Sequence, residues 1–239
     1  AKMYMVMVDD GHTGIWTSNS LIPFDELVRN TRGTITPECA DIIMTNPPFG
    51  SKGKVQDQNI LSEYDFGYAW KKNKKTGKFQ KEKLLAGKKG GGQVPDILFI
   101  ERCLALLKKG GRMGIVLPEG IFNNPSLRYV REFVEDRAFI RAVVSLPQET
   151  FISSGASVKA SLLFLQKFTE EEKMLFDEIY EKAKAETKAI YSNKIPKKIA
   201  NQKKLIQDIN NQNDLVENSI NLKEAEIYPK EMREEIAYE

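Results

Sequence analysis

The chain has 239 residues, of which 41% are hydrophobic and 29% are charged, and its formal net charge is +3. This composition is typical of a globular protein with one α/β domain and an appendage. The single histidine, His12, argues against sites built on several histidines, such as zinc centres and Ser/His triads. Cys39 and Cys103 lack metal-ligand spacing, and no apolar run approaches the roughly 18 residues of a membrane span. We therefore expect a reduced, cytoplasmic protein with no metal and no membrane segment.

The first part of the chain alternates apolar runs with turn residues. Residues 2–10 have helical composition, and residues 14–21 predict a short strand with Asn19 and Ser20 at its exit. Residues 40–45, "ADIIMT", predict a buried strand that ends at a pair of prolines. Residues 50–93 are rich in glycine and lysine and predict a long loop containing one helical turn.

The middle of the chain has a clearer alternation of helix and strand. Helices are predicted at 95–109, with Gly110 as the stop, and at 124–136, and strands at 112–118, 139–147 and 158–168. Strands that alternate with helices indicate an α/β fold with a mostly parallel sheet and helices on both faces.

The composition changes near residue 169. The last part of the chain is rich in Glu and Lys at helical spacing and has sparse apolar positions. We expect two regions, a domain over residues 1–168 and a charged helical tail over residues 169–239.

The turn that follows the 40–45 strand has unusual chemistry. Asn46-Pro47-Pro48-Phe49 stands where open α/β sheets bind their ligands, beyond the carboxyl end of a strand. The prolines stiffen the turn, so the Asn46 amide oxygen and the Pro47 carbonyl can accept hydrogen bonds from one amino group. Phe49 offers a face for stacking on a planar base. The alternative is a rigid loop around a buried Phe49.

This turn resembles the Asp/Asn/Ser-Pro-Pro-Tyr/Phe signature of amino-group methyltransferases that use S-adenosylmethionine. Together with "VPDILFIERCLALLKKGGRMGIVLPEGIFNNPSLRYVREFV" and "AVVSLPQETFISSGASVKASLLFLQK", it resembles the modification subunit of type I restriction-modification systems over residues 1–168. The resemblance implies a partial Rossmann-like sheet and methylation of the adenine N6 amino group in DNA.

The resemblance also implies roles for individual residues. Asn46, Pro47, Pro48 and Phe49 would bind and align an adenine turned out of the duplex. The cofactor contacts would be Asn19, Ser20 and Leu21, with Asn19 where the family usually has an acidic residue.

One family motif is missing from this sequence. The glycine-rich cofactor loop that should precede the proline turn has no counterpart here. We therefore expect a fragment that is inactive by itself and binds the cofactor weakly or not at all. We also expect an open sheet edge beside residues 41–45.

The predicted long loop carries a block of basic residues. Residues 71–89 contain nine lysines and one acid, and aromatic residues precede them. Such a block can neutralise phosphates, although lysine runs are also common on solvated surfaces. We predict DNA contacts at the following residues: Tyr68, Trp70, Lys71, Lys72, Lys74 and Lys75.

The implied partners are double-stranded DNA, a specificity subunit and a restriction subunit, and the helical tail is a candidate docking element for the specificity subunit. Two alternatives stay open. One is a methyltransferase that acts on RNA or protein glutamine, and the other is a non-catalytic nucleic-acid-binding or assembly module. Glu119 could be either a turn residue or a substrate contact.

Overall fold

A computed structural model describes most of the chain: residues 2–7, 14–49, 53–73, 77–86, 91–154 and 158–213. The chain divides into two units, Ala1–Phe176 and Asp177–Glu239. The elements of the first unit that build its sheets and cover them are α2 (Phe24–Asn30), β1 (Ala40–Thr45), α3 (Gln58–Ser62), η2 (Asp65–Gly67), β2 (Tyr68–Lys72), β3 (Phe79–Leu84), α4 (Pro95–Leu106), β4 (Leu107–Pro118), α5 (Gly120–Asn123), η3 (Pro125–Leu127), α6 (Arg128–Glu135), β5 (Ala138–Ser145), η4 (Gln148–Ser154) and β6 (Ala160–Lys167).

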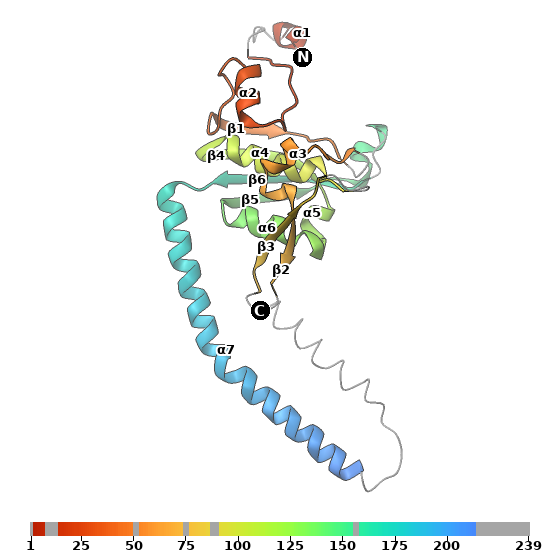
Figure 1. Cartoon of the computed structure of the whole chain (residues 1–239), viewed down its shortest axis with the longest axis vertical. Coiled ribbons are helices and arrows are strands. Elements are labelled where there is room, and N and C mark those ends of the chain that lie inside the picture. Colours follow the sequence, from red (N-terminus) through yellow and green to blue (C-terminus); the bar gives the residue numbers. More distant parts are fainter. Residues whose placement is uncertain are drawn as a thin grey trace. The chain divides into compact units, whose positions relative to one another are not determined.

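Four strands form the central sheet in the order β1-β4-β6-β5 (Figure 1). The pair β1–β4 is parallel, whereas β6 is antiparallel to both β4 and β5. Strands β1, β4 and β5 therefore share one direction, and β6 is inserted between two of them in reverse. The α/β class with parallel strands is confirmed, but only one of the three neighbouring pairs is parallel.

Side chains on one face of this sheet form the core. Met113 and Ile115 of β4 are 2% and 0% exposed, and Leu163 and Leu165 of β6 are 4% and 1% exposed. They belong to the same apolar cluster as Ile100 of α4 and residues of α6. Alternation along a strand sends the intervening side chains to the opposite face.

The opposite face of the sheet is open at several apolar positions. Ile42 and Met44 of β1 are 68% and 80% exposed, and Val144 of β5 is 46% exposed. The prediction of a buried strand at 40–45 is therefore wrong, because β1 is at the edge of the sheet and packs only Ile43 against the core. The prediction of helices on both faces is not met among the described residues.

Residues 14–21 form bends and turns in place of the predicted strand. The Leu21 N–H donates to the Asn19 side-chain oxygen at 3.0 Å. This local hydrogen bond favours a turn over a strand. Helix α2 follows directly. At the N-terminus, helix α1 (Lys2–Met7) falls within the predicted 2–10 helix, whose end lies outside the described residues.

The segment predicted as a long loop contains an antiparallel hairpin. Strands β2 and β3 pair with Trp70 opposite Lys81 and Lys72 opposite Phe79. Phe79 lies 6.2 Å from Tyr129 of α6, ring centre to ring centre. The apolar side chains among the lysines therefore anchor the hairpin, which a composition dominated by lysine and glycine conceals.

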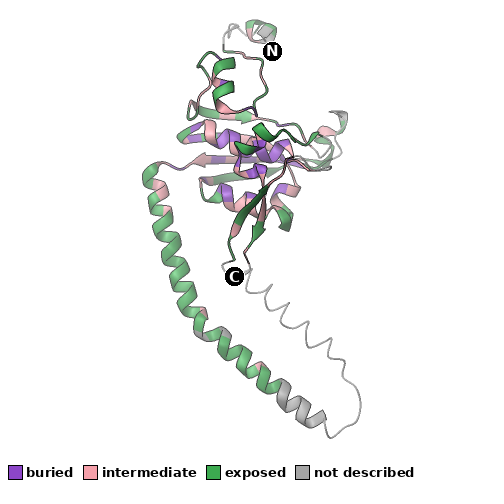
Figure 2. Ribbon diagram, in the orientation of Figure 1, coloured by how far each residue is buried: buried purple, intermediate pink, exposed green. Residues whose placement is uncertain are grey.

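Helix α7 (Glu170–Asn213) begins where the composition changes and confirms a helix in the tail. Its described side chains in the second unit are mostly exposed (Figure 2). Pro196 lies inside this helix.

Candidate active site

Three segments meet at one edge of the sheet because β1, β4 and β5 run in the same direction. They are the proline turn after β1, Glu119 after β4 and the η4 segment after β5. Carboxyl ends of like-directed strands are the usual ligand-binding edge of an α/β sheet.

The proline turn presents its asparagine to solvent. Asn46 and Pro48 are exposed, Pro47 is buried and Phe49 is half-buried. The buried Pro47 anchors a turn whose φ angles are restricted by two proline rings. The Asn46 amide is therefore accessible beside a rigid backbone, as the predicted role requires.

Phe49 has an aromatic neighbour that the sequence analysis did not single out. The Phe151 ring of η4 lies 5.8 Å from the Phe49 ring at an interplanar angle of 90°. An edge-to-face contact of this kind favours one ring orientation. The available signal was an aromatic residue shortly after the predicted 139–147 strand, in "LPQETF".

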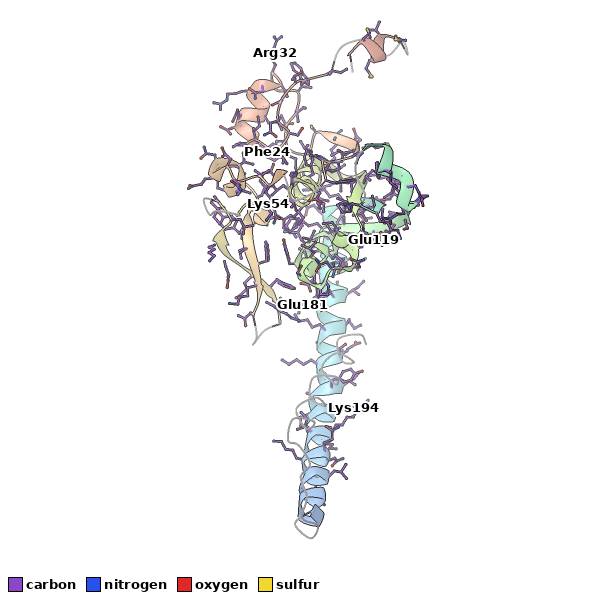
Figure 3. All side chains as sticks on the ribbon, turned by 90° about the vertical axis from the view of Figure 1, so that its right-hand side faces the viewer. Phe24, Arg32, Lys54, Glu119, Glu181 and Lys194 are labelled. Atoms are coloured by element: carbon purple, nitrogen blue, oxygen red, sulfur yellow. The ribbon has the colours of Figure 1, made fainter. Side chains whose placement is uncertain are left out.

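Glu119 follows β4 at the same edge (Figure 3). Its carboxylate accepts a hydrogen bond of 2.9 Å from the buried Ser161 hydroxyl. Its backbone N–H donates to the Lys159 carbonyl at 2.9 Å. These bonds tie Glu119 to the start of β6, which gives it a structural role in the turn.

The three predicted cofactor residues differ in what they can offer. Asn19 and Ser20 are exposed, whereas Leu21 is 4% exposed and belongs to the core. The Leu21 N–H donates to Asn19, and its carbonyl accepts from Tyr64 Oη at 2.9 Å. Only the side chains of Asn19 and Ser20 are therefore open to a ligand, and Leu21 supports their turn.

The hairpin brings together part of the predicted DNA-binding set. Lys71 and Lys72 are exposed on β2, and Tyr68 lies below the Lys81 ammonium group, 5.2 Å from its ring centre. Lys71 also forms an exposed ion pair of 3.7 Å with Glu82. Lys74 and Lys75 lie outside the described residues.

Trp70 is largely committed to the fold. Its ring stacks on Tyr129 at 5.8 Å and 14°, and its Nε1–H donates to the Asp65 carbonyl at 3.0 Å. Stacking on a nucleic-acid base would require this contact to open. The sequence could not reveal it because Tyr129 is distant in the chain.

Helix α4 carries two carboxyl groups that are withdrawn from water, the buried Asp96 and the half-buried Glu101. Burial raises the pKa of Asp96, which is 4% exposed, although the Ile97 N–H donates to its oxygen at 2.9 Å. Burial also raises the pKa of Glu101, whose oxygens accept from the Asp65 and Phe66 N–H groups at 2.8 and 2.9 Å. Both carboxyl groups accept hydrogen bonds from backbone N–H groups. Among the described residues, no hydrogen bond links either carboxyl group to the proline turn.

A cavity of about 380 Å³ lies elsewhere and includes none of the predicted site residues. Charged residues of both signs line it, and they pair with each other. Lys173 and Arg137 contact Asp136 at 3.0 and 3.1 Å, and Lys109 forms an ion pair with Glu170. We therefore place the candidate site at the proline turn and not in this cavity.

Within the described ranges, no cluster of three or more histidine, cysteine or acidic side chains has an arrangement that could hold a metal ion. The same part of the chain contains no helix both long and apolar enough to cross a membrane.

Fold and turn together define a methyltransferase-type α/β domain. The chain belongs to the N-6 DNA methylase family, whose model matches residues 1–237.

Solved structures of similar fold come from longer proteins. The M protein of the type I restriction enzyme EcoKI is 21% identical, with a TM-score of 0.44 over 72% of this chain and 29% of that one. A Vibrio vulnificus YJ016 protein described as the modification subunit of a type I restriction enzyme is 18% identical, with a TM-score of 0.46 over 75% of this chain and 37% of that one. A Listeria monocytogenes protein described as a class I S-adenosylmethionine-dependent methyltransferase is 21% identical, with a TM-score of 0.39 over 55% and 32%. The chain thus spans about a third of the length of these proteins.

Proposed function

We propose that this chain is the acceptor-binding part of a DNA adenine-N6 methyltransferase, in the modification subunit of a type I restriction-modification system. The observation that supports it most is the exposed Asn46 amide on a turn anchored by Pro47, next to the braced ring of Phe49. Membership of the N-6 DNA methylase family supports the same chemistry. A cytoplasmic setting follows from this role.

The proposed mechanism is mainly alignment. A target adenine leaves the duplex stack, because its amino group cannot otherwise reach the site. Asn46 Oδ1 and the Pro47 carbonyl accept hydrogen bonds from this amino group, which directs the nitrogen lone pair away from the base plane. Phe49 stacks on the base, and Phe151 fixes the orientation of Phe49. Holding the reacting nitrogen in one geometry lowers the barrier without a covalent enzyme intermediate.

S-adenosylmethionine supplies the methyl group when bound. Asn19 and Ser20 have exposed polar side chains that suit hydrogen bonds to the adenine edge of the cofactor, but the Asn19 side chain is only partly available. Asn19 Oδ1 already accepts from the Leu21 N–H, so its amide NH₂ group is the remaining donor.

The proposed macromolecular partners are double-stranded DNA, a specificity subunit and a restriction subunit. Lys71, Lys72, Lys74 and Lys75 would contact phosphates, with Tyr68 and Trp70 beside them. Helix α7 would dock on the specificity subunit, since it exposes apolar side chains in the second unit: Ile179 57%, Ile190 52% and Ile199 43% exposed.

A methylation assay of the full-length protein with its specificity partner tests the reaction. Asn46→Ala removes one of the two proposed acceptors, so we expect kcat to fall about 100-fold, as when an active site loses one key hydrogen bond. Asn59→Ala changes an exposed asparagine on α3 and should leave kcat unchanged. Wild-type rates for Asn46→Ala would refute the proposed mechanism. DNA binding without methylation by the wild-type complex would favour the non-catalytic module.

The salt dependence of DNA binding tests the hairpin. Replacing Lys71 and Lys72 by alanine should flatten the log–log salt slope by about 2, since each phosphate contact contributes roughly 0.9. Lys108→Ala/Lys109→Ala, at exposed positions near the start of β4, is the control with the same change in charge. An unchanged slope for the hairpin variant would remove the hairpin from the interface.

A further inference from the structure

A charged side chain is buried beneath the proposed cofactor segment. Arg102 of α4 is 2% exposed, the least accessible charged residue among the buried polar residues of the described chain. Its guanidinium carbon lies 3.9 Å from the centre of the Phe24 ring and 4.9 Å from that of Tyr64. Figure 3 labels Phe24, the first residue of α2.

The Arg102 guanidinium donates to the backbone of the segment that follows Ser20. Its Nη2 lies 2.6 Å from the Ile22 carbonyl oxygen and 3.4 Å from that of Leu21. Its Nε donates to Tyr64 Oη at 2.7 Å, and Tyr64 Oη donates to the Leu21 carbonyl at 2.9 Å. Two consecutive carbonyls are thus held from α4.

The burial of the Arg102 guanidinium is unfavourable for folding if packing is its only role. No carboxylate forms an ion pair with Arg102 in the described chain, and its buried Nη1 has no hydrogen-bond partner there. Burying a guanidinium without a counter-ion carries a desolvation penalty, and an apolar side chain of similar volume often serves packing equally well. What an apolar side chain cannot do is hold two backbone carbonyls at once.

We propose that Arg102 and Tyr64 are positioning residues that fix the Leu21–Ile22 backbone, so that the exposed side chains of Asn19 and Ser20 face the cofactor in one geometry. The inference rests on the proposed function for the choice of ligand. We call the contacts of Arg102 and Tyr64 with the Leu21–Ile22 backbone the clamp. The clamp itself rests on the hydrogen bonds and ring contacts given above.

The protonation of Tyr64 agrees with this role. Burial raises the pKa of Tyr64 to about 12, although the neighbouring Arg102 cation opposes the rise. The phenol therefore keeps its proton at neutral pH and donates to Leu21 while it accepts from Arg102.

The first arm of the test measures hydrogen exchange in this chain. Arg102→Met keeps the volume and removes the donors, so the Leu21, Ile22 and Phe24 amides should exchange about tenfold faster. Arg131→Met is the matched control, because Arg131 Nη1 donates to the Ile121 carbonyl of α5 and to the carbonyl of Asn124, its C-cap. Unchanged exchange in Arg102→Met, or equal acceleration in Arg131→Met, would overturn the clamp.

The second arm measures steady-state kinetics in the assembled methyltransferase. Arg102→Met should raise the KM for S-adenosylmethionine about tenfold and change kcat less than twofold, because the clamp affects binding and not the reacting groups. Faster exchange with an unchanged KM would overturn the positioning role. Tyr64→Phe removes one hydroxyl and should raise KM in the same direction, so it decides the question if Arg102→Met does not fold. A wild-type complex without methylation would refute the proposed function, and the exchange arm would still decide the clamp.

Discussion

Ile115 and Ile42 occupy opposite faces of the same sheet and have opposite surroundings. Ile115, on β4, is 0% exposed, and Ile42, on the edge strand β1, is 68% exposed. Side chains of α4 and α6 cover the first face, whereas the second leaves apolar side chains of β1 and β5 accessible. The same residue type therefore contributes differently, because hydrophobic stabilisation scales with the apolar area removed from water.

The comparison also separates the hydrogen-bonded groups. Tyr64, Arg102 and Glu101 belong to the covered side, where they bind the backbone of neighbouring segments. The proline turn stands at the carboxyl edge and leaves Asn46 exposed. The covered face thus stabilises the fold, and the sheet edge presents the side chains of the proposed site.

The largest expected effect is loss of the covered core. Ile115→Ala should lower the free energy of unfolding by about 3 kcal/mol, because the substitution leaves a cavity among buried neighbours. Ile42→Ala should change it by less than about 0.5 kcal/mol, since the side chain is already mostly in water. Urea denaturation of both variants measures the difference. Equal losses would show that the second face is covered in solution.

An intermediate effect is expected at alkaline pH. Burial raises the pKa values of Tyr64 and Cys103 to about 12, from ordinary values of 10.0 and 9.0. The folded state then holds these protons more tightly than the unfolded state, so their contribution is complete below about pH 9.

This contribution should be lost as the pH rises toward 12, at a cost on the order of 2 kcal/mol for Tyr64. Denaturation curves at pH 8 to 12 measure it. Tyr64→Phe should reduce the pH dependence, and Cys103→Ala should reduce it further. A wild-type stability independent of pH over this range would contradict the burial of both groups.

The smallest expected effect on stability lies on the open face. Ile42→Lys and Val144→Lys should leave the free energy of unfolding within about 0.5 kcal/mol and weaken the binding of an apolar fluorescent dye, because each adds charge to an exposed apolar surface. Met113→Lys is the control on the covered face and should unfold the protein. Unchanged dye binding in both open-face variants would place the dye elsewhere.

Several elements could be predicted from local sequence. The strand at 40–45 and the start of the helix at Pro95 agree with the structure, since each combines an apolar pattern with proline at its boundary. The end of that helix was predicted wrongly, because residues 107–109 belong to β4. The Asn46–Phe49 turn was recognisable because consecutive prolines after a strand are rare. The exposure of one face of the 40–45 strand was not predictable, because an apolar run does not reveal whether both faces are covered.

Contacts between distant segments account for what was missed. The Trp70 ring contacts Tyr129, and the Phe49 ring contacts Phe151, about 60 and 100 residues away in sequence. The hairpin went unpredicted because its lysines are solvated while its few apolar side chains pack on α6. The burial of Arg102 was missed because the Leu21 and Ile22 carbonyls that it binds are 81 and 80 residues away in the sequence.

The sequence by itself determined the order of helices and strands from Pro95 to the start of the tail, the rigid turn that ends β1, and the family to which these motifs belong. Only the tertiary structure decided the reversed position of β6, the open face beside Ile42, the contact between Phe49 and Phe151, and the burial of Arg102. The physical reason is that turns and periodicity depend on neighbouring residues, whereas burial and side-chain partners depend on which distant segments the fold brings together.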